Sequence, residues 1–357
     1  MKILFLAPYP HNKAPSQRFR FEFFLQSLQA EKIDFDFHSF LSEKGWKHSY
    51  TRGAVAMKIW ALVSGYLRRI ICLFKIHKYE IIFIHRELTP FGAPIFEWII
   101  AKVGRKKIIY DFDDAIWMSD PNGESTLWKT LKWRSKVAAI CQWSWKVSAG
   151  NQYLADYASQ YCDHVVVFPT VVNTAIHRPL NRRTSFQQKK LVIGWTGSHS
   201  TLVYLDPLIP VLQKLEQAHD FDFLVIANKN PELPLQGFYF LPWQEKTEIE
   251  DLSQIDIGIM PLADNEWSKG KCGFKLIQYS ALAIPSVTSP VGVNTNIIQD
   301  GQNGFLASSE EEWVEKLSLL IEDATLRKTM GQTGRKTVEA HYSVEANQEK
   351  WVELFKG

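Results

Sequence analysis

The chain has 357 residues, of which 46% are hydrophobic and 22% are charged. This is the composition of an ordinary soluble globular protein, and the length predicts two domains with full cores. The four cysteines show neither metal-ligand nor disulfide-framework spacing, so we expect a reducing, cytoplasmic environment. The N-terminus has the pattern of a strand and not of a signal peptide.

The net charge differs between the two parts of the chain. Residues 1–150 contain 23 Lys and Arg against 13 Asp and Glu, a net charge of +10, whereas the remainder contains 18 against 25, a net charge of −7. We therefore expect the N-terminal part to meet an anionic surface.

Much of the positive charge lies in residues 44–79, between Lys44 and Tyr79, which contain eight Lys and Arg and no Asp or Glu. Apolar residues are interleaved with these cations. Because Arg68 and Arg69 interrupt the apolar run, it is too short and too charged to span a bilayer. We expect a basic amphipathic helix that lies peripherally on the anionic inner face of the cell membrane. The alternative is a surface helix whose apolar face belongs to the core.

The first elements of the chain predict the start of a doubly wound sheet. Residues 1–7 form an apolar run typical of a buried parallel strand, and a loop and a helical pattern follow it. In such sheets, ligands bind at the carboxyl ends of the strands. Arg18 and Arg20 in the loop are candidate contacts to an acceptor, although two exposed surface arginines would give the same pattern.

A second polar cluster follows the predicted buried strand 79–85. It consists of His85, Arg86 and Glu87, three ionisable side chains at the end of a strand where an open α/β sheet places its function. Arg86 and Glu87 are therefore candidate acceptor-side residues, and His85 is a candidate catalytic residue.

Three carboxylates follow the predicted strand 106–110: Asp111, Asp113 and Asp114. Carboxylates this close repel one another, so the fold must offset their charge. A divalent metal, the arginines of the neighbouring loop or an acceptor hydroxyl could be the partners, and capping of the next helix is a further explanation. We favour acceptor-side contacts over a metal, because the lysines near Gly270 already supply positive charge for a diphosphate.

The middle of the chain indicates a domain boundary. Four tryptophans between residues 127 and 146 are interleaved with basic residues, but no single-strand-binding or groove-reading motif accompanies them, so we expect no nucleic-acid partner. A polar, basic stretch predicts a linker at 176–190. It separates an N-terminal domain at 1–175 from a C-terminal domain at 191–342, and we expect a last helix at 343–357 to pack back on the first domain.

The C-terminal domain begins with a strand that ends in a small-residue turn. Gly197 and Ser198 lie in this turn, which permits close approach of the backbone to a phosphate. Ser198 as the cap of the next helix is the simpler explanation.

The strongest signal for a bound ligand lies in the stretch 269–304. Lys271 and Gly273 precede a predicted helix that contains Lys275, and a second glycine turn follows at Gly292. Backbone N–H groups and the positive end of the helix dipole attract an anion, and the lysines neutralise it. A phosphate ester is the expected ligand.

Several segments of the second half recur in one order in a known family. They read IGWTGS at 193–198, DIGIMPL at 256–262, GFKLIQYSA at 273–281, PSVT at 285–288, PVG at 290–292 and NGFL at 303–306. In these segments, and in their spacing, the chain resembles a family-4-type retaining glycosyltransferase with the GT-B fold.

The resemblance implies an α/β fold of two Rossmann-like, doubly wound domains that face a central cleft. It also implies that the C-terminal domain binds a nucleotide-sugar donor and the N-terminal domain a saccharide or lipid-linked saccharide acceptor, without cofactor or metal. By position, the resemblance assigns Gln278 to the ribose. The residues that it places near the phosphates are Gly197, Ser198, Lys271, Gly273, Phe274, Lys275 and Gly292.

Two departures from the family pattern limit the assignment of the catalytic residues. Gly270 and Gln278 stand where the family has two glutamates, and Asp111 stands where a histidine is common. Asp111, His85 and Lys275 are therefore the candidate catalytic residues. The leading hypothesis is a peripheral-membrane glycosyltransferase that makes a cell-surface polysaccharide or glycolipid with retention. A non-catalytic nucleotide-sugar-binding subunit and a nucleotide-sugar epimerase with the GT-B fold are the alternatives.

Overall fold

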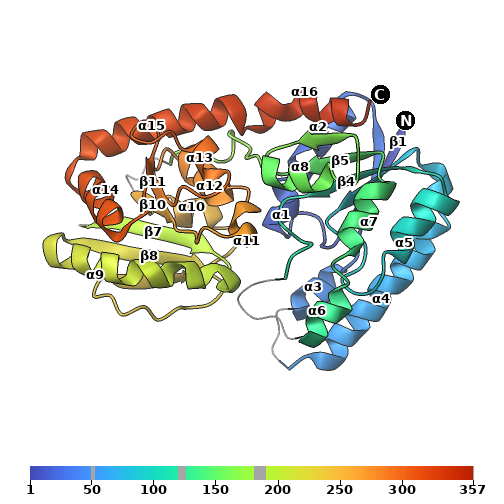
Figure 1. The fold of residues 1–357 in the computed structure, drawn as a ribbon, viewed down its shortest axis with the longest axis horizontal. Coiled ribbons are helices and arrows are strands. Elements are labelled where there is room, and N and C mark those ends of the chain that lie inside the picture. Colours follow the sequence, from blue (N-terminus) through green and yellow to red (C-terminus); the bar gives the residue numbers. More distant parts are fainter. Residues whose placement is uncertain (50–52, 120–125, 181–189, 357) are drawn as a thin grey trace. The chain divides into compact units, whose positions relative to one another are not determined.

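A computed structural model describes residues 1–49, 53–119, 126–180 and 190–356. They form two compact units, shown in Figure 1. Unit 1 comprises Met1–Thr170, Gly270–Cys272 and Gln348–Gly357, and unit 2 comprises Val171–Lys269 and Gly273–Asn347. Residues 181–189 of the predicted linker and residues 50–52 of the predicted basic segment lie outside the described residues.

The described part of unit 1 contains a six-stranded parallel sheet with the strand order β2-β1-β3-β4-β5-β6. Its strands are β1 Lys2–Ala7, β2 Asp34–Ser39, β3 Ile81–His85, β4 Lys107–Phe112, β5 Lys146–Ala149 and β6 Val165–Val167. Since β1 lies between β2 and β3, the strand order reverses beside β1, and the loops after these strands meet at one edge of the sheet.

The helices of unit 1 connect consecutive strands of this sheet. They are α1 Pro15–Arg18, η1 Glu22–Phe24, α2 Leu25–Ala30, α3 Glu43–Ser49, α4 Val55–Leu73, η2 Ile76–Lys78, α5 Ile95–Trp98, η3 Ile99–Val103, α6 Thr126–Lys132, α7 Lys136–Trp143 and α8 Gln152–Ala158.

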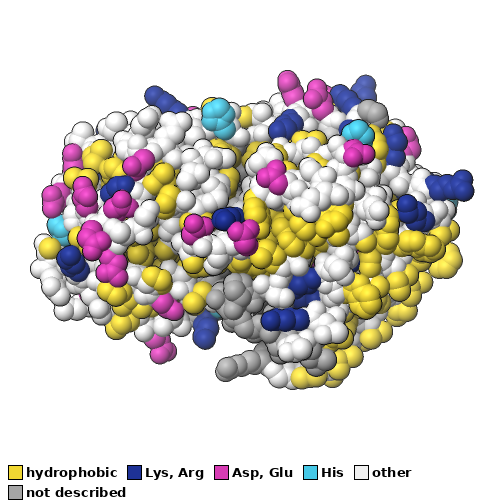
Figure 2. Space-filling view, viewed as in Figure 1, with side chains coloured by type: hydrophobic (Ala, Val, Ile, Leu, Met, Phe, Trp, Pro, Cys, Tyr) yellow, Lys and Arg dark blue, Asp and Glu magenta, His cyan; other side chains and the backbone are white. Residues whose placement is uncertain are grey.

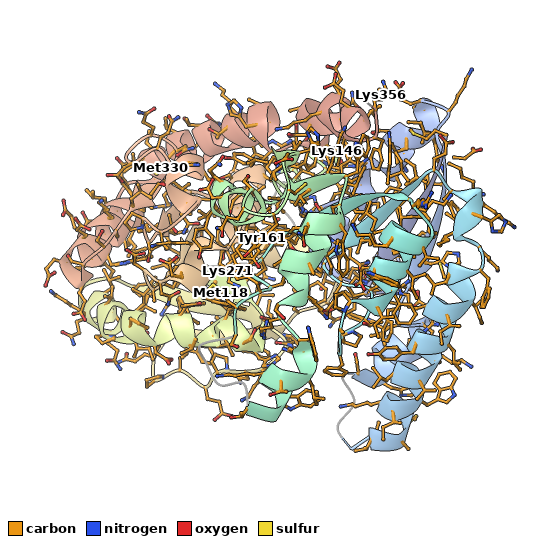
Figure 3. All side chains as sticks on the ribbon, turned by 45° about the vertical axis from the view of Figure 1, so that its right-hand side comes forward. Met118, Lys146, Tyr161, Lys271, Met330 and Lys356 are labelled. Carbon is orange, nitrogen blue, oxygen red and sulfur yellow. The ribbon has the colours of Figure 1, made fainter. Side chains whose placement is uncertain are left out.

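The last residues of the chain complete the core of unit 1. Trp351 is fully buried, and its ring stacks on Phe24 at 5.1 Å between centroids and contacts Phe83 at 5.4 Å. Nζ of Lys146 donates to the carbonyl oxygen of Lys356 at 2.7 Å; Figure 3 labels both residues. These contacts fix the C-terminal segment to the sheet of unit 1.

The described part of unit 2 contains a second six-stranded parallel sheet, with the order β12-β11-β10-β7-β8-β9. Its strands are β7 Leu191–Gly197, β8 Phe221–Ala227, β9 Phe238–Pro242, β10 Ile257–Met260, β11 Ser286–Thr288 and β12 Phe305–Leu306. Its helices are η4 His199–Leu208, α9 Ile209–Ala218, α10 Glu248–Leu252, α11 Glu266–Lys269, α12 Phe274–Ala281, α13 Asn294–Ile297, α14 Glu310–Glu322, α15 Ala324–His341 and α16 Val344–Leu354, which ends in unit 1.

Both faces of this sheet are covered, as the near-continuous apolar strands predict. Ile193 and Trp195 of β7 point into a core cluster that includes residues of α9 and α14. Val192 of the same strand points into a cluster on the other face, with Leu252 of α10 and Tyr279 of α12. Two parallel, doubly wound sheets confirm the predicted α/β fold class.

Three local differences from the prediction have physical causes. Strand β5 was not expected, because its sequence KVSA is short and half polar. The helix expected after the small-residue turn at Gly197 and Ser198 is a 3₁₀ segment from residue 199 to 208 followed by α9, and Pro207 lies inside the 3₁₀ part. Strand β12 has only two residues and gives no periodicity to detect.

The helix expected in the basic segment is α4, and it is amphipathic in the predicted sense. Its buried side includes Ala61, Gly65 and Arg69. Arg69 was counted among the surface cations, but it is 2% exposed and donates to the carbonyl oxygens of Ala7, His38 and Leu88. Arg69 therefore stabilises the fold and is not available to a membrane.

Candidate functional site

Asp111, at the end of β4, is the centre of a buried polar network in unit 1. Its Oδ1 accepts hydrogen bonds from Nη2 of Arg20 and from Oγ of Ser148, and its Oδ2 accepts from Nδ1 of His85 at 2.7 Å and from Nε of Arg20 at 3.4 Å. Burial alone would raise the pKa of the Asp111 carboxyl, but the charge of Arg20 and the contact with His85 outweigh it and hold this pKa well below its usual value.

This network corrects two assignments made from the sequence. Arg20 is completely buried, and its Nη1 also donates to the carbonyl oxygen of Phe168. Its guanidinium is therefore not available to an acceptor substrate. Asp111 is also completely buried, and each of its oxygens accepts two hydrogen bonds from protein donors, so, unlike Nε2 of His85, it has no unpaired atom left for a substrate. Arg18 is 8% exposed, and its guanidinium lies over the ring of Phe19.

His85 has one oriented and one unpaired ring nitrogen. Nδ1 lies 2.7 Å from Oδ2 of Asp111, and this contact with a carboxylate fixes the orientation of the ring. Nε2 is buried and has no hydrogen-bond partner among the described residues. The side chain of His85 is completely buried, so the predicted catalytic group is oriented but not exposed.

The two other carboxylates of the acidic loop also have cationic partners. Oδ1 of Asp113 accepts from Nε of Arg86 at 2.7 Å, and the carboxylate of Asp114 accepts from Nζ of Lys271 at 2.9 and 3.0 Å. Burial raises the pKa of Asp113, but Arg86 and the nearby His85 outweigh it, so this pKa is lowered. Protein cations therefore neutralise the carboxylates for which a divalent metal was one of the possible partners.

Some predicted acceptor-side groups remain accessible. The side chains of Arg86, Asp113 and Asp114 are 24%, 12% and 22% exposed. Glu87 is 35% exposed and pairs with Nζ of Lys136 at 2.7 Å, a lysine that the sequence gave no reason to select. These side chains form a charged surface at the ends of β3 and β4.

In unit 2, the predicted phosphate-binding residues follow adjacent strands β7, β10 and β11. Gly273 caps α12 with a left-handed backbone (φ 65°), and Gly292 has φ 56° in the turn after β11. A Cβ on Gly273 would lie 2.2 Å from Ile297, so both the conformation and the space require glycine. Phe274 and Lys275 thus begin a helix of eight residues at the carboxyl edge of the sheet.

Trp195 connects the glycine turn to this helix. Nζ of Lys275 lies 5.3 Å from the centroid of the Trp195 ring. A Cβ on Gly197 would lie 2.4 Å from the same ring, so this glycine is required for packing as well as being suited to close approach of a phosphate. Ser198 is exposed, and its Oγ is 2.9 Å from Oγ of Ser200.

Gln278, the predicted ribose contact, lies one helical turn after Lys275 and is 2% exposed. Its Nε2 donates to Oε1 of Glu248 at 3.4 Å, and Nε1 of Trp243 donates to the same oxygen at 3.2 Å. A carboxylate from α10 thus lies beside the position where the family has its second glutamate. Glu248 stands in an acid-rich helix, so the sequence offered no signal to distinguish it.

Lys271 was also predicted near the phosphates, and in the structure it belongs to unit 1. Its Nζ pairs with Asp114, and its carbonyl oxygen accepts from Nδ2 of Asn151 at 2.9 Å. Figure 3 labels Lys271. The segment that contains it is therefore held by two hydrogen-bonding contacts to the ends of β4 and β5.

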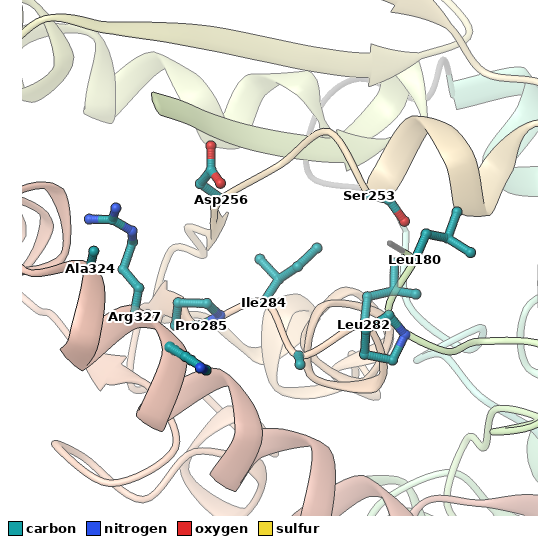
Figure 4. Close-up of a pocket in the computed structure, with 11 residues that line it drawn as sticks. Leu180, Ser253, Asp256, Leu282, Ile284, Pro285, Ala324 and Arg327 are labelled. Atoms are coloured by element: carbon teal, nitrogen blue, oxygen red, sulfur yellow. The ribbon is translucent and has the colours of Figure 1, made fainter. Parts of the chain in front are cut away.

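A cavity of about 330 Å³ in unit 2 lies at the opposite edge of the sheet from these residues. Its walls include Asp256 and Pro285, which precede β10 and β11, and Arg327 of α15, as Figure 4 shows. Asp256 accepts from the backbone N–H of Val192 at 2.9 Å, and Arg327 donates to the carbonyl oxygens of the α14 end. This cavity contains none of the predicted site residues.

The part of the chain that the structure describes contains neither a metal-binding cluster nor a membrane-spanning helix. Across residues 1–49, 53–119, 126–180 and 190–356, no cluster of three or more His, Cys, Asp or Glu side chains is arranged to hold a metal ion. In the same residues, no helix is both long enough and apolar enough to cross a bilayer.

Part of the C-terminal half is similar to a known protein family. Residues 190–323 match the family described as Glycosyl transferases group 1. The chain is also 35% identical over 80 residues to the capsular polysaccharide biosynthesis glycosyltransferase CapM of Staphylococcus aureus. That alignment covers 22% of this chain, and the chain spans about a fifth of the length of this curated relative. Residues 190–323 are thus similar to group 1 glycosyltransferases, over less than half of the chain.

Solved structures extend the likeness to both units. Sucrose-phosphate synthase from Thermosynechococcus elongatus has a TM-score of 0.75 at 13% identity, with 99% of this chain and 98% of that chain covered. HepE of Anabaena in complex with UDP-glucose has a TM-score of 0.68 at 15% identity, with the same coverage. The fold is therefore GT-B, as expected.

Proposed function

We propose that the protein is a glycosyltransferase that moves a sugar from a nucleotide-diphosphate donor to a saccharide or lipid-linked saccharide acceptor. The observation that carries the proposal is the helix start at Gly273 and Lys275, which lies inside the segment that matches the glycosyltransferase family. The left-handed glycine turn, the positive end of the helix dipole and a lysine at one sheet edge suit a departing diphosphate.

Unit 2 would hold the donor and unit 1 the acceptor. The donor assignment is supported by the UDP-glucose bound to HepE, which has the same fold. The acceptor assignment is supported by the charged surface formed by Arg86, Glu87, Asp113 and Asp114 at the ends of β3 and β4. Lys275 is the residue proposed to stabilise the leaving diphosphate, and His85, oriented by Asp111, is the proposed catalytic group of unit 1.

Retention and independence from metal ions are parts of the same proposal. Retention is supported only by the resemblance to retaining enzymes. Metal independence is supported by Lys275 in unit 2 and by the pairing of each acidic-loop carboxylate with a protein cation. A membrane-peripheral, cytoplasmic role in cell-surface polysaccharide or glycolipid synthesis is supported by the similarity to CapM and by the basic segment that contains α4.

The test is incubation of the full chain with a panel of nucleotide sugars and with saccharide and lipid-linked acceptors, in buffers with and without EDTA. We expect transfer from one donor, at a rate that EDTA does not change. The absence of both transfer and donor hydrolysis across the panel would contradict the proposal.

A non-catalytic nucleotide-sugar-binding subunit is the second candidate function. It is favoured by one observation: Gly270 and Gln278 occupy the two positions at which the family has glutamates. Tight nucleotide-sugar binding in calorimetry, together with no turnover by any acceptor in the panel, would support this candidate instead.

A further inference from the structure

Unit 1 contains a cavity of about 260 Å³ at the carboxyl edge of its sheet. Its floor is formed by the residues that follow β1 and β3, including Tyr9 and Leu88. Its walls come from α3 and α4, where Ala61 and Leu62 line it, and from the loop that carries Phe91. The cavity therefore lies where a parallel sheet places its binding sites.

The lining of this cavity is apolar. Lys58 and Glu87 are its only charged lining residues among the described residues, and Glu87 already pairs with Lys136. Tyr9 and Ser49 are the lining side chains that carry a hydroxyl group, so a buried sugar would find few partners for its several hydroxyl groups, which is costly. A hydrocarbon chain meets no such penalty, so the lining selects a lipid and not a saccharide.

The helix that forms one wall also has an exposed apolar face. Leu62 lines the cavity, whereas its neighbours Trp60 and Val63 are 57% and 52% exposed. Figure 2 shows a continuous run of apolar side chains along the part of unit 1 where Figure 1 labels α4 and α5. The exposed large hydrophobic residues of α4 are Val55, Met57, Ile59, Trp60, Val63, Leu67, Ile70 and Ile71. Such a face is suited to the acyl region of a bilayer.

Charge identifies the kind of lipid. Apart from the buried Arg69, the described residues 53–79 contain four Lys and Arg and no acid. Lys58, on the cavity wall, and Lys75, beyond the end of α4, are exposed cations. A lipid that carries a phosphate next to its hydrocarbon chain satisfies both features, because the chain fits the cavity and the phosphate meets a lysine at its border.

We propose that this cavity binds the hydrocarbon chain of a phosphate-bearing lipid-linked acceptor, which enters from the bilayer beside α4. The inference rests on the proposed function, and it narrows the acceptor from a saccharide in general to a lipid-linked one. Unit 1 then binds the acceptor by its lipid in the cavity and by its sugar at the charged surface after β3 and β4.

The test uses farnesyl phosphate as the probe, below its critical micelle concentration, and calorimetry with the full chain. Leu62→Trp fills the cavity, and Val63→Trp adds the same bulk to the exposed face of the same helix as a matched control. We expect Leu62→Trp to weaken farnesyl phosphate binding at least tenfold and Val63→Trp to leave it unchanged. Equal binding by both variants, or no binding by the unaltered chain, would overturn the proposal.

Two further measurements distinguish the loss of lipid binding from misfolding and from recognition of the phosphate alone. Leu62→Gln makes the wall polar without filling it, so it should weaken binding even if Leu62→Trp fails to fold, and thermal unfolding of each variant reports folding. Competition by inorganic diphosphate as strong as that by farnesyl phosphate would show that only the phosphate is recognised, which would overturn the proposal. Nucleotide binding, measured separately with UDP, tests the proposed function in unit 2 and does not depend on Leu62.

Discussion

Replacement of Asp111 by asparagine should destabilise unit 1 much more than the same replacement of an exposed acid. In the structure, Oδ1 accepts hydrogen bonds from Arg20 and Ser148, and Oδ2 accepts them from His85 and Arg20. An asparagine therefore faces a donor with its own NH₂ group in either orientation. It also leaves the buried guanidinium of Arg20 without its counter-charge.

The expected loss follows from this geometry. Removing one partner of a fully buried ion pair costs about 3–5 kcal/mol, because the remaining charge stays buried and uncompensated. We therefore expect Asp111→Asn to lower the free energy of unfolding of unit 1 by about 3–5 kcal/mol. Asp34→Asn is the matched control, since Asp34 is an exposed acid on β2, and its effect should be within about 0.5 kcal/mol.

Urea denaturation, with hydrogen exchange of peptides from β3, β4 and β5 as the readout specific to unit 1, measures this loss. A loss for Asp111→Asn below about 1 kcal/mol, the value of an ordinary surface interaction, would refute the reasoning. A double-mutant cycle with Arg20→Met gives a second check. The two substitutions should cost clearly less together than the sum of their separate costs, because they remove the two members of one pair.

The other predictions concern pH, catalysis, the helix cap and membrane binding. Since pairing holds the pKa of Asp111 below its unfolded value of about 3.9, its stabilising effect should be present at neutral pH and decline only as the pH falls below that value; acid titration of the unaltered chain should show a loss that Asp111→Asn lacks. Lys275→Ala should lower turnover by about 10²-fold or more in the transfer assay if Lys275 stabilises the leaving diphosphate, and an unchanged rate would exclude that role. Gly273→Ala should destabilise unit 2 by about 1–3 kcal/mol in thermal unfolding, because the residue has φ 65° and its Cβ would overlap Ile297; an unchanged melting temperature would contradict the requirement for glycine. Joint replacement of the exposed Lys75 and Lys78 by alanine should weaken binding to anionic vesicles by about 2 kcal/mol, at about 1 kcal/mol per lysine, and undiminished sedimentation with vesicles would contradict the membrane role.

The sequence predicted the elements that have a strong local pattern. The buried strands β1, β3, β7 and β8 are continuous apolar runs, and the start of α12 is marked by glycine and lysine. Strand β5 was missed because only long-range pairing with β4 and β6 defines it. Local periodicity cannot detect a strand of four residues with a lysine and a serine.

The position of the site could be predicted from the sequence, but the ion-pair partners of its residues could not. The ends of β3 and β4 were expected to carry function because of their place in a parallel sheet. The pairing of Arg20 with Asp111 joins residues 91 positions apart, and that of Lys271 with Asp114 joins residues 157 positions apart. A sequence without structure cannot distinguish such buried pairs from exposed charges, and for this reason Arg20 was assigned to the acceptor.

The position of Trp351 has a consequence for the synthesis of the protein. Because this fully buried ring belongs to the core around Phe24 and Phe83, unit 1 cannot complete its packing until residue 351 has left the ribosome. Unit 2, most of which is synthesised earlier than that residue, can fold first. The sheet of unit 1 therefore completes its packing only after α16 has been synthesised.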